Sequence, residues 1–259
     1  MDLGIAGRTA ILLGSSRGLG RACAESIARE GVHVVVNGRT AADVERAAHE
    51  LSSAHGVKAT AVVGDAGDPD TQQRLLKAAP APDIVLLNGA GPSPAKFGDL
   101  TPEAWSEALN NGLVGPLSFV QLVLPGMCER RFGRIVAISS AMVKSPNSLM
   151  SLSHGTRLGL SGVLKGISKD VARFGVTINQ ILPERFDTAR QEQMAQVAMK
   201  MKGITYEEAR AEQVASIRAR RLGRPEELGD AFAFLCSAQA GYLSGQNIQL
   251  DGGSYEGVF

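Results

Sequence analysis

A glycine-rich stretch near the start of the chain has the residue types and the spacing of a phosphate-binding loop. Residues 10–20 read AILLGSSRGLG. Gly14 permits a tight turn after an apolar run, and Gly18 and Gly20 let a pyrophosphate group and the strand approach the backbone closely. A helix that opens at the last glycines points free backbone N–H groups and the positive end of its dipole at the same place. We therefore predict nucleotide contacts from Gly14, Ser16, Arg17, Gly18, Leu19 and Gly20.

The alternation of apolar and polar stretches predicts the elements that position this loop. Strand-like and helix-like stretches alternate along the chain, which is typical of a parallel sheet covered by helices on both faces. The expected strands are 10–13, 32–36, 57–63, 83–87, 134–138, 176–182 and 247–250. Expected helices begin at Gly18 and cover 41–54, 69–79, 102–110, 114–131, 149–173 and 225–236. The predicted fold class is α/β, a single-domain doubly wound parallel sheet (Rossmann fold) over residues 1–259.

Arginines near the predicted end of the second strand favour one of the two nicotinamide dinucleotides. A carboxylate at this place would bind the ribose hydroxyls of NAD, but the chain has Asn37 and then Arg39, and the glycine loop adds Arg17. Arginine offers a planar fork of donors that matches a 2′-phosphate. The sequence therefore predicts NADP(H) as the cofactor. The alternative is that both arginines are solvated loop residues.

Composition and charge argue against several other classes of protein. The chain has 259 residues, of which 44% are hydrophobic and 20% charged, as expected for one soluble globular domain. A net charge of +1 gives no reason to expect a nucleic-acid partner. No apolar run approaches the roughly 18 residues of a membrane span, and the first residues lack a signal segment, so we expect a cytoplasmic protein without a membrane partner. Cys23, Cys128 and Cys236 are scattered, and no metal site is expected.

The glycine spacing, G-x-x-x-G-x-G, resembles that of the short-chain dehydrogenase/reductase superfamily. The resemblance continues to the C-terminal segment that ends in Asp251, Gly252 and Gly253, and residues 88–91 are similar to the family's N-N-A-G segment. It implies further cofactor contacts after the third, fourth and sixth strands. These residues are Asp65, Ala66, Asn88, Gly89, Ala90 and Pro183. From sequence alone, a turn-stabilising role for Asp65 is an equal alternative.

The resemblance also implies where the reaction takes place. Such enzymes place an Asn, a Ser, a Tyr and a Lys around the nicotinamide. Ser140 stands where the family's serine stands, and its hydroxyl would hold and polarise a substrate carbonyl. The family's Tyr-x-x-x-Lys pair starts thirteen positions later, where this chain has Ser153 and Arg157. Counted from Trp105, the family's asparagine position falls on Gly112.

Helix geometry favours Arg157 as the replacement for the lysine. Residues four apart share a helix face, so Ser153 and Arg157 both point toward the cofactor. His154 is rotated by about 100° from Ser153, and taking it as the tyrosine substitute would put Leu158 at the lysine position. We therefore expect Arg157 to contact the nicotinamide ribose. The alternative is a surface arginine in the middle of a helix.

The proton donor is the open question at this site. Ser153 is far too weak an acid at neutral pH to replace a phenol. Lys144, four residues after Ser140, is a candidate because desolvation and nearby cations lower a lysine pKa from its usual value of about 10.4. It would donate a proton to a developing alkoxide. A solvated loop lysine is the alternative.

These observations predict an NADP(H)-dependent oxidoreductase that transfers hydride between the nicotinamide and a small-molecule carbonyl or alcohol. By resemblance, 3-oxoacyl thioesters are the nearest substrate class, and residues 187–221 form a substrate lid. Two alternatives stay open: an inactive NADP(H)-binding sensor or assembly protein, and a lyase or isomerase on the same fold. The C-terminal segment resembles the family's subunit-contact region, so a homodimer or homotetramer is expected.

Overall fold

Seven strands form one continuous parallel sheet in the computed structural model, which describes residues 2–258. The strands are β1 Thr9–Leu12, β2 His33–Gly38, β3 Ala59–Val63, β4 Ile84–Leu87, β5 Gly133–Ile138, β6 Val176–Pro183 and β7 Asn247–Leu250. Their order across the sheet is β3-β2-β1-β4-β5-β6-β7. The order reverses direction between β1 and β4, the place where open α/β sheets bind ligands. The predicted doubly wound parallel sheet is confirmed.

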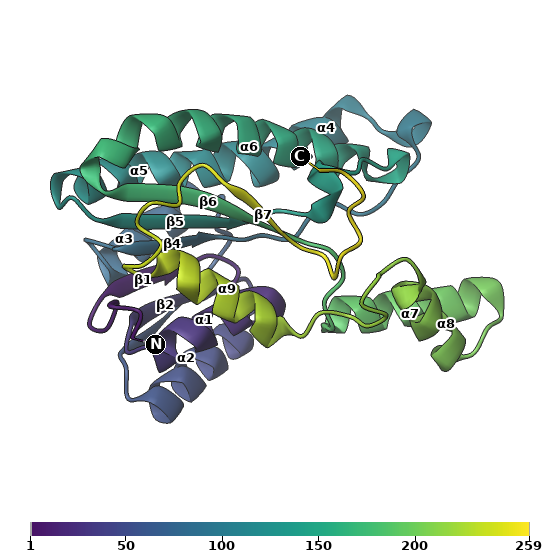
Figure 1. Cartoon of the computed structure of the whole chain (residues 1–259), viewed down its shortest axis with the longest axis horizontal. Helices are drawn as coiled ribbons and strands as arrows, with labels where there is room; N and C mark the ends of the chain where they lie inside the picture. The colour runs from purple at the N-terminus through teal and green to yellow at the C-terminus, as the bar shows by residue number, and fades with distance from the viewer. Residues whose placement is uncertain (1, 259) are drawn as a thin grey trace.

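Helices cover both faces of this sheet (Figure 1). One face carries α1 Gly18–Arg29, α2 Ala41–His55 and α9 Pro225–Cys236. The opposite face carries α3 Pro69–Ala78, α5 Gly115–Glu129 and α6 Ser151–Val171, and α4 Pro102–Leu109 packs against α6. The central strands are therefore shielded on both sides, which suits their nearly continuous apolar runs, whereas the edge strands β3 and β7 are only partly buried.

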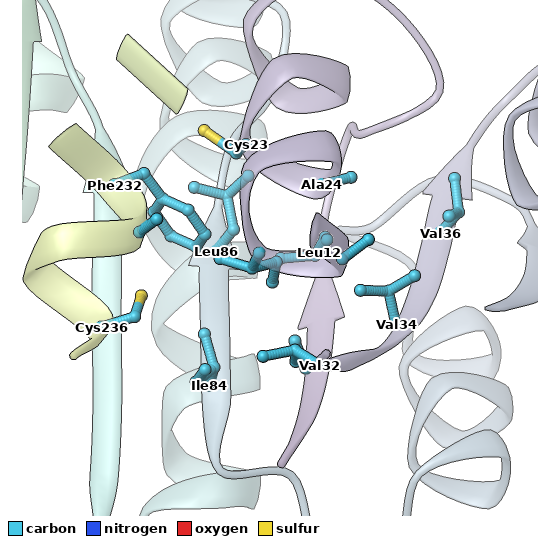
Figure 2. Close-up of a cluster of buried hydrophobic side chains, with 14 of the residues drawn as sticks. Leu12, Cys23, Ala24, Val32, Val34, Val36, Ile84, Leu86, Phe232 and Cys236 are labelled. Carbon is cyan, nitrogen blue, oxygen red and sulfur yellow. The ribbon is translucent and has the colours of Figure 1, made fainter. Parts of the chain in front are cut away.

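Strand side chains alternate between two hydrophobic cores. Leu12 and Leu86 belong to the core beneath α1, α2 and α9, together with Phe232 of α9 (Figure 2). Their neighbours Ile11 and Val85 belong to the core beneath α3, α5 and α6. This two-residue period is the geometry of a pleated strand, and it explains why the apolar runs are continuous rather than alternating.

Two of the cysteines are part of the first core. Figure 2 shows Cys23 of α1 and Cys236 of α9 among the buried apolar side chains, and both are 0% exposed. Burial raises the pKa of both thiols above the usual range. Both therefore stay protonated at neutral pH and behave as small hydrophobic residues.

Two strand boundaries differ from the prediction by two residues, and no other strand end differs by more than one. β2 continues to Gly38 rather than ending at Val36, because Asn37 and Gly38 pair with the last two residues of β3. β3 begins at Ala59 rather than at Val57. A polar residue followed by glycine is typical of a turn, but here both residues lie inside the ladder.

The two helices expected at 102–110 and 114–131 form one helical run. A five-residue π-helical segment, η2 Asn110–Val114, joins α4 to α5 without a break. By length and composition, the run Pro102–Glu129 is long and apolar enough to cross a membrane, a test that core helices of soluble proteins also pass. Only 28% of its most apolar window is buried, so much of its apolar surface faces outward.

The polar segment 187–221 contains two helices rather than irregular chain. They are α7 Ala189–Lys202 and α8 Tyr206–Ala215, which pack against each other. Figure 1 shows this pair standing away from the sheet and its covering helices. The start of α8 is fixed by a capping box between Thr205 and Glu208.

Candidate active site

The glycine loop closes against the end of β4. Asn88 Nδ2 donates a hydrogen bond to the Gly14 carbonyl over 2.8 Å. Gly14 has φ +59°, and a Cβ there would lie 2.7 Å from the Asn88 carbonyl oxygen. A Cβ at Gly20 would lie 2.2 Å from the Gly14 carbonyl oxygen. Both glycines are thus required by close backbone packing at the place where the strand order reverses.

Asn37 braces the same loop from the neighbouring strand. It is 1% exposed, and its Oδ1 accepts a 3.3 Å hydrogen bond from the Gly14 N–H. Its Nδ2 donates to the carbonyl oxygens of Val62 and Gly64, each over 3.1 Å. Asn37 therefore ties the ends of β1, β2 and β3 together, and the first residue beyond β2 is Arg39 rather than Asn37.

The loop and the start of α1 fit the phosphates of a dinucleotide. Gly18 has φ +57°, and nothing lies closer than 4.0 Å to the place that a Cβ would occupy. Arg17 is the N-cap of α1, and its side chain makes no capping hydrogen bond. The first N–H groups of α1 are left for a ligand, and they carry the positive end of the helix dipole. The segment from Ser16 to Gly20 would hold a pyrophosphate there.

The two predicted phosphate-binding arginines both lie near the start of α2. The Arg17 Nε atom is 3.3 Å from Asp43 Oδ2, so its side chain reaches across from the glycine loop to the first turn of α2. Arg39 is exposed between the end of β2 and α2. Thr40, the N-cap of α2, makes no side-chain capping bond. An uncapped helix start with two nearby guanidinium groups is a suitable setting for an anion.

The other predicted cofactor residues lie at the carboxyl edge of the sheet. Asp65 is exposed, and its Oδ1 accepts a 2.8 Å hydrogen bond from the Gly67 N–H. It therefore stabilises a turn, as the alternative interpretation predicted. Four other residues follow or end strands of the sheet: Ala66 after β3, Gly89 and Ala90 after β4, and Pro183 at the end of β6. No observation tests their contacts with a cofactor, so these remain predictions.

Arg157 crosses the carboxyl ends of β4 and β5 instead of facing solvent. Its Nε donates to Ser153 Oγ over 3.1 Å, and one terminal nitrogen donates to the Ile138 carbonyl over 3.1 Å. The other terminal nitrogen lies 3.2 Å from the place that a Cβ would occupy at Gly91, just after β4. The predicted pairing of Ser153 and Arg157 on one face of α6 is confirmed by this bond.

The environment of Arg157 is positively charged. Its guanidinium is largely buried, and burial first, then the charge of Arg190, lowers the pKa of Arg157 from its usual range. Within residues 2–258 no carboxylate forms an ion pair with Arg157. Because an arginine stays charged in proteins, this site holds an uncompensated positive charge.

The serines and His154 occupy distinct positions around α6. Ser140 follows β5, and its Oγ accepts a 3.2 Å hydrogen bond from the Met142 N–H, capping the short helix η3 Ala141–Val143. Ser153 is 4% exposed. The His154 ring turns toward the chain before α6, where its Nε2 accepts a 2.7 Å hydrogen bond from the Asn147 N–H. As helix geometry predicted, His154 points away from the face that carries Ser153 and Arg157.

The π-helical segment explains the glycine at position 112. A Cβ there would lie 2.9 Å from the Thr156 Cβ. The Thr156 hydroxyl is itself held by 3.1 Å hydrogen bonds to the carbonyls of Leu152 and Ser153. An asparagine at position 112 would therefore require the start of α6 to shift. The adjacent Asn110 and Asn111 are both exposed.

Lys144 contacts a tyrosine that sequence reasoning did not connect with the site. The Lys144 Nζ lies 5.2 Å from the centroid of the Tyr255 ring, in the range of a cation–π interaction. Tyr255 is far from Ser140 in the sequence, so motif spacing does not connect the two residues. The available signal was the pair of glycines after Asp251, which allow the chain to turn back after the last strand.

Over residues 2–258, no three His, Cys, Asp or Glu side chains come close enough together to hold a metal ion.

Comparison with known proteins places the chain in a family. Residues 14–255 match the family model described as "Enoyl-(Acyl carrier protein) reductase". The 3-oxoacyl-[acyl-carrier-protein] reductase FabG of Aquifex aeolicus is 30% identical over 260 residues, covering 98% of this chain and 100% of the relative. L-sorbose reductase from Gluconobacter frateurii, solved with NADPH and L-sorbose, superposes with a TM-score of 0.95 at 26% identity, over 100% of both chains. A 3-oxoacyl (acyl-carrier-protein) reductase from Agrobacterium tumefaciens C58, solved with NADP bound, has a TM-score of 0.87 at 30% identity, over 97% and 96% of the two chains.

The dinucleotide loop, the polar groups around Arg157 and these matches define an NAD(P)-dependent oxidoreductase that acts on carbonyl or alcohol substrates. The chain belongs to the short-chain dehydrogenase/reductase superfamily and is similar to its FabG members.

Gly20→Ala tests the loop geometry. The added methyl group would overlap the Gly14 carbonyl, so the loop must move away from α1. We expect the Kd for NADPH, measured by fluorescence titration, to rise at least roughly tenfold, which corresponds to about 1.4 kcal/mol. Gly98→Ala is the control, since a Cβ at Gly98 would have no neighbour within 4 Å. An unchanged Kd in a folded Gly20→Ala protein would contradict the assignment of the loop.

Proposed function

We propose that this protein is an NADP(H)-dependent carbonyl reductase in which Ser153 and Arg157 occupy the places of the family's tyrosine and lysine. The observation that carries the proposal is the placement of Arg157. Its guanidinium is held by Ser153 and by the end of β5, beside the loop that follows β4. That is the region in which the nicotinamide half of a dinucleotide held by the glycine loop would lie.

Each residue at this site has its own role in binding the cofactor or polarising the substrate carbonyl. Bound NADPH supplies the hydride. The Ser140 hydroxyl, at the end of β5, donates a hydrogen bond to the carbonyl oxygen and stabilises the negative charge that develops on it. Arg157 contacts the nicotinamide ribose and adds a fixed positive charge nearby. Ser153 accepts a hydrogen bond from Arg157 and so fixes the orientation of its guanidinium.

The preference for NADP(H) over NAD(H) rests on the start of α2. Arg39 directly precedes Thr40, the uncapped N-cap of α2, and Arg17 reaches the first turn of the same helix through Asp43. A 2′-phosphate there would receive charge-assisted hydrogen bonds from both arginines. The bound cofactors of the two structural neighbours, NADPH and NADP, agree with this choice.

Arg39→Asp should move the cofactor preference toward NADH. A carboxylate repels the 2′-phosphate and can accept hydrogen bonds from ribose hydroxyls, so the ratio of the NADPH and NADH dissociation constants should change by roughly 10²-fold or more. Lys77→Asp, on the exposed side of α3, makes the same change of charge away from the loop and is the control. The assignment fails if the ratio is the same in both variants.

The substrate is a small carbonyl compound bound between the sheet edge and a lid formed by α7 and α8. These helices follow Pro183 at the end of β6 and stand away from the body, so they are placed to cover a substrate. Met194 and Met201 are 45% and 81% exposed and offer adaptable apolar surface for that purpose. The names of the relatives direct the first assays to 3-oxoacyl thioesters and ketose sugars.

Ser140→Ala tests whether turnover comes from this site. We expect wild-type protein to oxidise NADPH with one or more members of a panel of ketones, aldehydes and 3-oxoacyl thioesters. Removing the hydroxyl should lower kcat by roughly 10²–10³-fold, the usual effect of losing one oxyanion donor. Ser145→Ala, in the exposed part of the same loop, should leave kcat unchanged. If the wild-type protein binds NADPH and turns over none of these compounds, the reductase proposal is wrong.

A second copy of the chain is the partner that best fits the outer surface of α5 and α6. Between Glu107 and Glu129 the chain carries no charged residue. The exposed apolar side chains on this surface are Val114 at 51%, Leu122 at 43%, Leu158 at 46% and Val163 at 42% exposure. Glycines at positions 162 and 166 of α6 are also exposed, and nothing lies within 4 Å of the place that a Cβ would occupy there, which lets another backbone approach. We propose that this surface forms the contact of a homodimer, alone or within a homotetramer.

Two charges on this surface should separate the subunits. The double variant Leu122→Glu, Val163→Glu would bury carboxylates without partners at the contact, so it should be monomeric at micromolar concentration. Size-exclusion chromatography with light scattering measures the mass. Met201→Glu, on α7, should keep the wild-type mass. A monomeric wild-type protein would show that this surface has another use.

A further inference from the structure

The chain reverses direction directly after the last strand of the sheet. Gly252 and Gly253 have φ +60° and +79°, a conformation that other residues rarely adopt. A Cβ at Gly252 would lie 2.8 Å from the Ile217 Cγ2, so the turn packs tightly against the chain that follows α8. In Figure 1 the yellow C-terminal segment leaves β7 and turns back at this point.

The turn delivers Tyr255 to the loop that follows Ser140. The Asp251 carboxylate accepts hydrogen bonds from the backbone N–H of Gly253 at 3.0 Å and of Tyr255 at 2.9 Å, which fixes the start of the segment. The half-buried Tyr255 ring then lies beneath the Lys144 ammonium, 5.2 Å from its centroid. The Asx-type turn thus fixes the backbone of Tyr255, and the Lys144 ammonium contacts the face of its ring.

Lys144 is rigidly linked to Ser140. The short helix η3 lies between them: the Met142 N–H donates to Ser140 Oγ, and the Lys144 N–H donates to the Ala141 carbonyl over 3.1 Å. Tyr255 is therefore placed against the same turn of chain that carries the hydroxyl proposed to bind the substrate oxygen. The C-terminal segment therefore contacts the loop that begins at Ser140.

We propose that Tyr255 is the proton donor of this enzyme and that Lys144 is its positioning residue. The inference rests on the proposed reductase function and names the group which that proposal leaves out. A phenol is a competent general acid near neutral pH when a cation stabilises the phenolate that it leaves, whereas the Ser153 alcohol is not. The phenol of Tyr255 would come from the C-terminal segment and the ammonium of Lys144 from the loop after β5, whereas the family's Tyr-x-x-x-Lys pair lies on one helix.

The step balances with the cofactor as the only redox partner. The carbonyl carbon receives hydride from the reduced nicotinamide, and the C=O π bond breaks as the carbonyl oxygen takes the Tyr255 hydroxyl proton. The products are an alcohol, the oxidised nicotinamide and a Tyr255 phenolate beside the Lys144 ammonium. The phenolate recovers its proton from water, which can reach the half-buried side chain.

The other two tyrosines are not suited to this role. Tyr206 lies on α8 beside Arg210, and Tyr242 is fully exposed in the segment that precedes β7. Because β7 is parallel to β6, that segment is at the edge of the sheet opposite the carboxyl ends of the strands. Tyr255 is thus the tyrosine that the fold brings to the Ser140 loop.

Tyr255→Phe removes the hydroxyl and keeps the ring beneath Lys144, so the variant should fold. We expect kcat to fall by roughly 10²–10⁴-fold, the range of general acid catalysis, with an unchanged Kd for NADPH. Tyr242→Phe is the matched control and should retain wild-type kcat. Lys144→Met should lower kcat by a smaller factor than Tyr255→Phe does, and Lys144→Arg should keep most of the wild-type kcat. The double variant Tyr255→Phe, Lys144→Met should have a kcat only slightly below that of Tyr255→Phe, because the two groups act as a unit.

A chemical readout places the phenol without measuring turnover. Tetranitromethane nitrates accessible tyrosines, and mass spectrometry of peptides assigns each site. We expect oxidised cofactor together with the best ketone of the panel to slow nitration of Tyr255 and to leave Tyr242 unaffected.

The outcomes separate this inference from the function on which it rests. If the wild-type protein turns over and Tyr255→Phe keeps its kcat, with nitration of Tyr255 unaffected by ligands, Tyr255 is not the donor. A loss of kcat in Lys144→Met and in Lys144→Arg, with none in Tyr255→Phe, would assign the proton to Lys144 itself. Absence of wild-type turnover on the whole panel would overturn the reductase function, and the role of Tyr255 with it.

Discussion

Two asparagines, the buried Asn37 and the half-buried Asn88, hold the carboxyl edge of the sheet in the shape that the site needs. Asn37 joins the ends of three strands, and Asn88 joins the glycine loop to β4 across the point where the strand order reverses. Without these amides the carbonyls of Gly14, Val62 and Gly64 would lose partners at a place where water has little access, which costs about 1–3 kcal/mol for each unsatisfied group. The conformation of the nucleotide loop therefore depends on the hydrogen bonds between the strand ends as well as on its glycines.

Above this braced edge, the site is built with positive charge and few acids. Arg157 is desolvated and lies near Arg190, an arrangement that costs free energy in the empty protein. Binding of a ligand with electron-rich oxygens offsets this free-energy cost, because the N–H donors of the guanidinium then have acceptors in a region of low dielectric. Desolvated charges of this kind are frequent at functional sites, and buried structural arginines such as Arg134 show the same lowering of the pKa, so the position of Arg157 at the carboxyl edge of the sheet is what points to function.

Local patterns predicted the sheet well because the strands β1, β2, β4 and β5 are built around apolar runs. The same method ended β2 too early, since Asn37 followed by Gly38 is typical of a turn, and only the pairing with β3 shows that both residues belong to the ladder. Spacing on one helix predicted that Ser153 and Arg157 share a face, and the bond between them confirms it. The contact of Lys144 with Tyr255 could not be predicted in this way, because it joins two loops that only the complete fold brings together.

The same limit applies to Gly112 and Gly155. A glycine in a helix usually indicates weak local stability, but here each leaves room for one side chain of a neighbouring helix: Thr156 for Gly112, and Trp105 for Gly155. The sequence contains all four residues, but their pairing is visible only once α4, the π-helical segment and α6 are packed together.

The contact between Gly112 and Thr156 has a consequence for any attempt to rebuild this site. A side chain added at position 112 would begin 2.9 Å from the Thr156 Cβ, so an asparagine there and Thr156 in its present place exclude each other. Gly112→Asn alone therefore creates an overpacked contact, which a shift of α6 or a smaller residue at position 156 has to relieve. The two positions act as one unit in any redesign.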